Sequence, residues 1–177
     1  AERLKKLGLL RSSGVNPYPI DSRSDYRLAE VIKNFDKLAT RKKSIHLVGR
    51  VRALRGQGGI LFFNFDDGTA IFQGVIKKDE IVEADFNLFR DTVDIGDFIE
   101  VAGSLFVTNR QEKTLMTKEW RMLGKSLRPL PDKWGGLADI EERFRRRYLD
   151  SLMSPEVKKR FVFRSQLITA IRTFLNK

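Results

Sequence analysis

The 177-residue sequence contains no cysteine and a single histidine. Without cysteine, disulfide bonds and thiolate metal sites are excluded, and a reducing, cytoplasmic location is the natural expectation. No apolar run approaches the roughly 20 residues that a helix needs to span a bilayer. The N-terminal residues mix charged side chains with leucines and lack the apolar block of a signal peptide. We therefore expect a cytoplasmic protein without a membrane partner.

Catalytic and metal-binding motifs are also missing. The sequence contains neither a P-loop nor a GxGxxG motif. His46 falls inside a predicted strand with no second histidine to complete a metal site, so we predict a structural or surface role for it. The acidic pair Asp66-Asp67 falls at a turn, where carboxylates accept hydrogen bonds from backbone N–H groups. We expect no catalytic residue, no metal ligand and no cofactor in this chain.

Positive charge is what the sequence has in excess, with a net charge of +11. Residues 1–50 carry 12 basic and 5 acidic side chains (+7), residues 51–124 carry 9 and 12 (−3), and residues 125–177 carry 13 and 6 (+7). A polyanionic partner such as RNA, DNA or an anionic membrane fits this surplus, although a solvated basic surface fits it too. If the partner is a nucleic acid, we expect the two flanks to hold phosphates and the centre to read bases.

The centre of the chain has the pattern of a small barrel. Strands are predicted at residues 45–53, 60–65, 70–76, 98–107 and 114–122, with a helix at 78–89. In the first strand Leu47, Val51 and Ala53 share one face, and Gly49 lies where the strand can bend or bulge. This order predicts a mainly β protein with α elements, a five-stranded OB-fold Greek-key barrel with N-terminal helices and a C-terminal helical extension. An SH3-like barrel also has five strands, but it does not usually place a helix after the third.

Helices are predicted on both sides of the barrel. Before it, residues 2–11 have helical spacing, and Ser24 or Asp25 can cap a second helix. After it, a Pro/Gly-rich connector leads to a helix with Asp139 and Glu142 at capping-box spacing, and Ser154 caps the last helix. We divide the chain into an N-terminal helical extension (1–44), the barrel domain (45–124), the connector (125–138) and the helical start of a further domain (139–177).

A candidate binding site follows from strand parity. Phe63 lies on one face of the second strand and Phe62 on the other. If Phe63 faces the core, Phe62 offers its ring to an unpaired base, and such stacking contributes roughly 1–3 kcal/mol. Arg55 ends the neighbouring strand and Gln73 lies in the paired third strand, within reach of that base. The alternative is that Phe62 packs under a loop or the N-terminal helix.

Two segments resemble one known family. The first runs from Arg3 through Leu7, Leu10, Arg11 and Gly14 to Asn16-Pro17-Tyr18-Pro19, and the second is Leu127-Arg128-Pro129-Leu130-Pro131-Asp132-Lys133, continuing to Arg145-x-Arg147-Tyr148-Leu149-Asp150. Together they are similar to the anticodon-binding region and the beginning of the catalytic domain of class II lysyl-tRNA synthetases. Aspartyl- and asparaginyl-tRNA synthetases share the OB-fold but differ in these segments. The resemblance covers nearly the whole chain.

The resemblance implies that the barrel reads the U-rich anticodon of tRNA-Lys. It implies that Phe62 stacks on an anticodon base, that Arg55 and Gln73 bond base edges, and that Glu112 helps recognise the anticodon. One departure is that the usual Gly-Lys before the phenylalanine reads Gly58-Gly59 here, so a phosphate contact of that lysine is lost or supplied elsewhere.

The resemblance also implies what lies beyond this chain. Lysine, ATP and Mg²⁺ would bind on a later catalytic sheet, so we expect this chain by itself to be inactive. Residues 161–177 are similar to the helix of the first class II motif, which builds a homodimer interface. Their wide apolar arc needs a cover, so we expect the protein to continue past Lys177.

Two other interpretations stay open at this point. One is a free-standing OB-fold module that binds single-stranded nucleic acid without sequence preference. The other is a dimerisation fragment that acts mainly through its last helix, which is compatible with anticodon binding.

Overall fold

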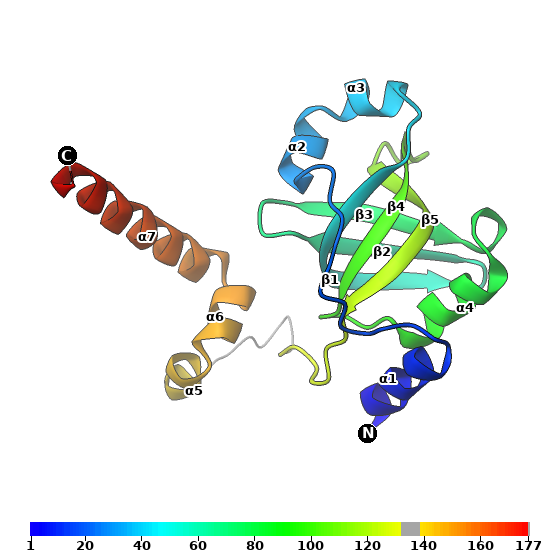
Figure 1. Ribbon diagram of the computed structural model, residues 1–177, viewed down its shortest axis with the longest axis horizontal. Coiled ribbons are helices and arrows are strands. Elements are labelled where there is room, and N and C mark those ends of the chain that lie inside the picture. The colour runs from blue at the N-terminus through cyan, green and yellow to red at the C-terminus, as the bar shows by residue number, and fades with distance from the viewer. Residues whose placement is uncertain (132–138, 177) are drawn as a thin grey trace. The chain divides into compact units, whose positions relative to one another are not determined.

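The computed structural model describes residues 1–131 and 139–176 (Figure 1). Contacts within the chain separate two units, Ala1–Pro129 and Leu130–Lys177. The first unit contains the barrel with α1 (Glu2–Ser12), α2 (Leu28–Lys33) and α3 (Phe35–Thr40), and the second contains α5 (Ile140–Arg145), α6 (Arg147–Met153) and α7 (Pro155–Leu175). Half of the predicted connector, residues 132–138, lies outside the described residues. Any finer division into domains stays a prediction.

Five strands close into the barrel: β1 (Ile45–Gln57), β2 (Ile60–Asp66), β3 (Ile71–Lys77), β4 (Phe98–Val107) and β5 (Lys113–Gly124). Their order around the barrel is β1-β2-β3-β5-β4, and every neighbouring pair is antiparallel except β3 and β5, which are parallel. The predicted OB-fold barrel is confirmed. The helix expected at 78–89 is instead a short 3-10 turn, η1 (Lys78–Glu80), followed by α4 (Glu83–Thr92).

Aromatic rings fill the barrel and one of its ends. Phe63 and Phe65 are buried, as their parity predicts, with ring centroids 5.6 Å apart. Phe89 of α4 packs on Phe63 at 5.3 Å and on Trp120 of β5 at 5.1 Å. The helix between β3 and β4 therefore closes the barrel by joining its core.

A bulge in β1 reverses the parity of that strand. The register with β2 shifts between Val51 and Ala53, and beyond the shift Leu54 pairs with the buried Phe63 and packs against the core. The prediction that Ala53 shares the inner face with Val51 is therefore wrong. The consequence is functional, because the extra residue brings Arg55 to the outer face.

Gly49 is needed for close packing and not for the bulge. It pairs with Ile99 of β4 in regular register. A Cβ atom here would lie 2.8 Å from the ring of Phe65 and 3.1 Å from the backbone nitrogen of Asp66. The bulge therefore lies between Val51 and Ala53 and not at Gly49, where the sequence suggested a bend or bulge.

The segment before the barrel forms two short helices that begin later than expected. Asp25 does not cap a helix, and its Oδ2 accepts a hydrogen bond of 2.8 Å from the backbone N–H of His46. The first residue of α2, Leu28, donates its N–H to Asp67 Oδ2 at 2.9 Å. Asp67 lies in the β2–β3 turn, so this turn caps α2 and holds it against the barrel.

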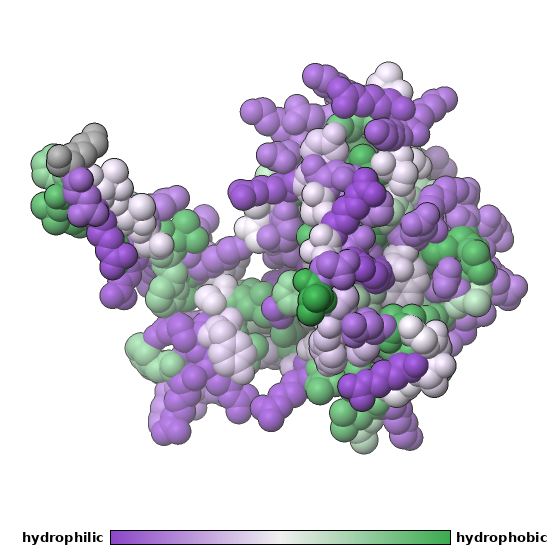
Figure 2. All heavy atoms as spheres, in the orientation of Figure 1, coloured by the Kyte–Doolittle hydropathy of each residue, from purple (hydrophilic) through white to green (hydrophobic). Residues whose placement is uncertain are grey.

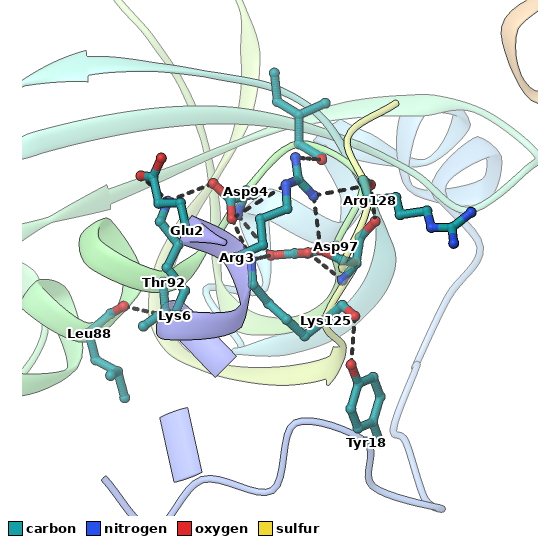
Figure 3. A network of polar contacts seen from close by, with 12 residues as sticks. Glu2, Arg3, Lys6, Tyr18, Leu88, Thr92, Asp94, Asp97, Lys125 and Arg128 are labelled. Carbon is teal, nitrogen blue, oxygen red and sulfur yellow. Dashed lines mark hydrogen bonds and ion pairs between the residues drawn. The ribbon is translucent and has the colours of Figure 1, made fainter. Parts of the chain in front are cut away.

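Buried charge attaches α1 to the barrel (Figure 3). Lys125 follows β5, is buried, and places its Nζ 2.6 Å from Asp94 Oδ2 and 2.7 Å from Asp97 Oδ2. Lys6 of α1 reaches the other oxygen of Asp94 at 2.7 Å. Burial raises the pKa of Asp94, but hydrogen bonds from Lys125 and Lys6 outweigh burial and hold this pKa below its ordinary value. The network connects α1, the loop before β4 and the residue after β5.

The second unit consists of helices with the predicted caps. The Asp139 side chain accepts a hydrogen bond of 2.9 Å from Glu141 N, and Ser154 Oγ accepts one of 3.4 Å from Val157 N. Glu142 pairs with Arg146 at 3.2 Å and does not complete a capping box. The surface of α7 exposes several large apolar side chains: Phe161, Val162, Phe163, Leu167, Ile168, Ile171, Phe174 and Leu175. In the part of the chain that the structure describes, no helix combines the length and the hydrophobicity that a bilayer crossing requires.

Candidate nucleic-acid interface

A groove with a volume of about 590 Å³ lies on the outer face of the barrel. Its walls come from β1–β3 on one side and from the end of β4 and the β4–β5 hairpin on the other. The lining residues are Arg55, Ile60, Phe62, Val75, Lys77, Phe106, Val107, Thr108, Asn109, Arg110 and Glu112. The groove combines aromatic rings with cations and one carboxylate.

Phe62 lies in this groove and is half-buried. It pairs with Arg55 on β1 and with Val75 on β3. Because Phe63 points into the core, Phe62 points outward. Its ring is neither sealed in the interior nor free on an open surface, and it faces a hollow that could receive a flat ligand.

Polar side chains connected by two hydrogen bonds and one ion pair stand beside Phe62. Arg55 Nη2 donates to Gln73 Oε1 at 2.8 Å, and Gln73 Nε2 donates to Thr114 Oγ1 at 2.9 Å. The same Arg55 Nη2 lies 3.9 Å from Glu112 Oε2. The structure thus brings Arg55, Phe62, Gln73 and Glu112 together, although they come from four different segments.

The groove has further residues that the sequence reasoning missed. Phe106 is a second half-buried aromatic side chain in the lining, and its parity relative to the buried Leu105 was a signal that could have found it. Lys77 and Arg110 add two cations. Lys77 pairs with Ile60 next to the Gly58-Gly59 turn, so a cation stands near the position where the expected lysine is absent.

His46 belongs to a separate structural cluster. Its Nδ1 lies 3.3 Å from Glu100 Oε1, while Glu100 Oε2 accepts hydrogen bonds from Arg121 at 2.8 Å and from the backbone N–H of Arg23 at 2.9 Å. Burial raises the pKa of Glu100, but these donors outweigh burial and hold it below its ordinary value. The cluster joins the N-terminal segment to β1, β4 and β5, so the contacts of His46 are those of a structural residue.

Comparison with known proteins decides what kind of barrel this is. Residues 45–123 match the tRNA anticodon family, described as an OB-fold nucleic acid binding domain. The barrel belongs to this family. It is a tRNA anticodon-binding OB-fold, and the groove on its outer face is the candidate anticodon site.

Curated relatives match almost the whole chain. A lysine–tRNA ligase of Carboxydothermus hydrogenoformans is 38% identical over 99% of this chain and 35% of its own length. One from Dehalococcoides mccartyi is 37% identical over 99% of this chain and 36% of its own length. Lysine–tRNA ligase 2 of Methanosarcina mazei is 36% identical over 98% of this chain and 34% of its own length. The chain therefore spans about a third of the curated relatives that it matches.

Proposed function

We propose that this chain is the anticodon-binding part of a lysine–tRNA ligase and that it binds the U-rich anticodon loop of tRNA-Lys. The observation that carries the proposal is the outward-facing Phe62 in a groove with Arg55, Gln73 and Glu112 beside it. A base stacked on this ring would present its edge to those three side chains. The hydrogen bond between Arg55 and Gln73 holds their remaining donors and acceptors at a fixed distance from each other. Such an arrangement suits the polar edge of uracil better than it suits non-specific binding of the RNA backbone.

Each groove residue has a proposed role. Phe62 stacks on an anticodon base, Arg55 and Gln73 bond its edge, and Glu112 accepts a hydrogen bond from a neighbouring base. Lys77 and Arg110 are the other two cations that line the groove, and we assign them to the flanking phosphates.

The parent protein would be a homodimeric class II ligase of the cytoplasm that uses ATP and Mg²⁺ to attach lysine to tRNA. Within the described residues no group of three or more His, Cys, Asp or Glu side chains is placed to hold a metal ion. Because this chain spans only about a third of the length of its relatives, we assign ATP, Mg²⁺ and the reaction itself to the remaining part of such a protein, and we expect this chain alone to be inactive. The exposed apolar side chains of α7 are the proposed start of the dimer interface.

The experiment is a binding titration at fixed salt with two RNA hairpins of equal length. One carries the anticodon loop of tRNA-Lys, and the other carries an unrelated loop on the same stem. We expect clearly tighter binding of the lysine hairpin. A module without sequence preference would bind both alike with similar salt dependence, and this outcome would refute the proposal.

A further inference from the structure

Five exposed cations gather on the segment that leads into the barrel. They are Lys33, Lys37, Arg41, Lys42 and Lys43, and we call them the basic surface. Figure 2 shows hydrophilic side chains covering this part of the molecule, where Figure 1 draws α2 and α3. Helices α2 and α3 contain two carboxylates, Glu30 and Asp36. Glu30 already accepts a hydrogen bond of 3.0 Å from the backbone N–H of Arg27.

The cations of the basic surface lack the partners that cations elsewhere have. Lys78 pairs with Glu83 at 2.8 Å, Arg90 pairs with Asp91 at 2.8 Å, and Lys118 pairs with Glu80. Among residues 1–131 and 139–176, none of the five cations of the basic surface has a carboxylate within ion-pair distance. Five like charges within eleven residues repel one another, and a bound polyanion would relieve that repulsion.

The basic surface lies next to the β4–β5 hairpin, which forms one wall of the groove. Phe35, the first residue of α3, packs on Phe72 with ring centroids 6.4 Å apart. Phe72 directly precedes Gln73, which accepts the hydrogen bond from the groove residue Arg55. Lys113, which directly follows Glu112, places its Nζ 5.0 Å from the ring of Phe35.

The pairing of strands explains why these residues meet. Because β3 and β5 are parallel, with Gln73 beside Thr114, both strands begin at the same end of the barrel. Helix α3 covers that end. A strand of RNA whose bases enter the groove would continue past the groove within reach of the basic surface.

We propose that the basic surface binds the phosphodiester backbone of the RNA whose bases occupy the anticodon groove. This inference rests on the proposed function and adds a second, sequence-independent contact to it. The groove distinguishes loops, and the basic surface strengthens binding of every loop on the same stem. Phosphate contacts carry no base information and release counterions, so their loss lowers affinity uniformly and reduces the salt dependence.

The test compares two charge-matched double variants of the 177-residue chain. Lys37→Gln with Arg41→Gln removes two charges from the basic surface. Lys5→Gln with Arg11→Gln removes one lysine and one arginine, both exposed, from α1, which Figure 1 draws at the opposite end of the barrel. Binding of the lysine hairpin and of the unrelated hairpin is titrated at several salt concentrations, and a thermal melt checks that both variants fold.

We expect the Lys37/Arg41 variant to bind both hairpins roughly tenfold more weakly at 0.1 M salt, with the slope of log K against log[salt] reduced by about 1.5. Its preference for the lysine loop should stay unchanged. The Lys5/Arg11 variant should match wild type. Equal affinities and slopes for the two double variants, with loop preference intact in wild type, would overturn this inference alone. Loss of loop preference in wild type would instead overturn the proposed function, and with it the inference.

Discussion

Arg55 and Gln73 hold each other in place on the outer face of the barrel, at the groove that contains Phe62. The hydrogen bond from Arg55 Nη2 to Gln73 Oε1 is 2.8 Å long and joins β1 to β3 past Phe62 on the intervening strand. Gln73 is also oriented by Thr114, because Gln73 Nε2 donates a hydrogen bond of 2.9 Å to Thr114 Oγ1 on the neighbouring strand β5. Because Arg55 and Gln73 are already held in this way, the two side chains would lose less conformational entropy on binding the proposed base, which favours affinity.

This pairing predicts that the two side chains act as a unit. Arg55→Ala and Gln73→Ala should each weaken binding of the lysine hairpin, and the double variant should lose less than the sum of the two. We expect a coupling of about 0.5–3 kcal/mol, because residues in one hydrogen-bond network are not additive. A double-mutant cycle by fluorescence anisotropy measures it. Strictly additive losses would show that the two residues contribute separately.

Phe62→Ala should weaken binding of the lysine hairpin by roughly 1–3 kcal/mol, since it removes the stacking surface for one base. Titration at fixed salt measures the loss. Phe98→Ala is the matched control, because Phe98 is also a partly exposed phenylalanine of the barrel but does not line the groove. Equal affinities of wild type and Phe62→Ala would contradict the stacking role.

The sequence predicted the barrel well because its strands alternate and its turns carry glycine. Strand parity placed Phe62 outside and Phe63 inside without any structural information. The same reasoning failed on β1, where the bulge between Val51 and Ala53 adds a residue that no local signal marks. Uninterrupted alternation from Val51 would have turned Arg55 inward, so its place in the groove depends on an irregularity that only the fold reveals.

Long-range partners were equally invisible in the sequence. Asp25 looks like a helix cap, but Asp67, 39 residues after Leu28, supplies the hydrogen bond instead. The pairing of Lys6 and Lys125 with Asp94 likewise needs three distant segments to meet. Periodicity reports which face a residue occupies, and it carries no information about which other segment lies opposite.

Asp67→Ala should lower the free energy of unfolding by about 1–2 kcal/mol, the cost of losing a helix cap. The side chain accepts hydrogen bonds from Leu28 N at 2.9 Å and from Thr69 N at 2.8 Å, so both α2 and the β2–β3 turn lose a partner. Urea denaturation measures the change. Asp36→Ala is the control, because Asp36 is an exposed carboxylate on α3. Equal stability of the two variants would show that Asp67 does not hold α2.

Acid should destabilise the fold through carboxylates that are held ionised. Burial raises the pKa values of Asp67, Asp94 and Glu100, but their hydrogen-bond donors and cations outweigh burial, so each pKa lies below its ordinary value. The unfolded chain therefore takes up protons first, near pH 4. The stability that these groups contribute is fully present above about pH 5 and is lost as the pH falls through their lowered pKa values.

Asp94→Asn tests this reasoning on one residue. The variant keeps the shape of the side chain but removes a negative charge from beside Lys125 and Lys6, so it should be less stable than wild type by about 1–3 kcal/mol at pH 7. Because the asparagine does not titrate, the variant should lose less stability than wild type between pH 6 and pH 3. Urea denaturation across this range measures both effects, with Asp36→Asn as the control. Parallel stability curves for wild type and Asp94→Asn would show that the Asp94 network does not drive the acid response.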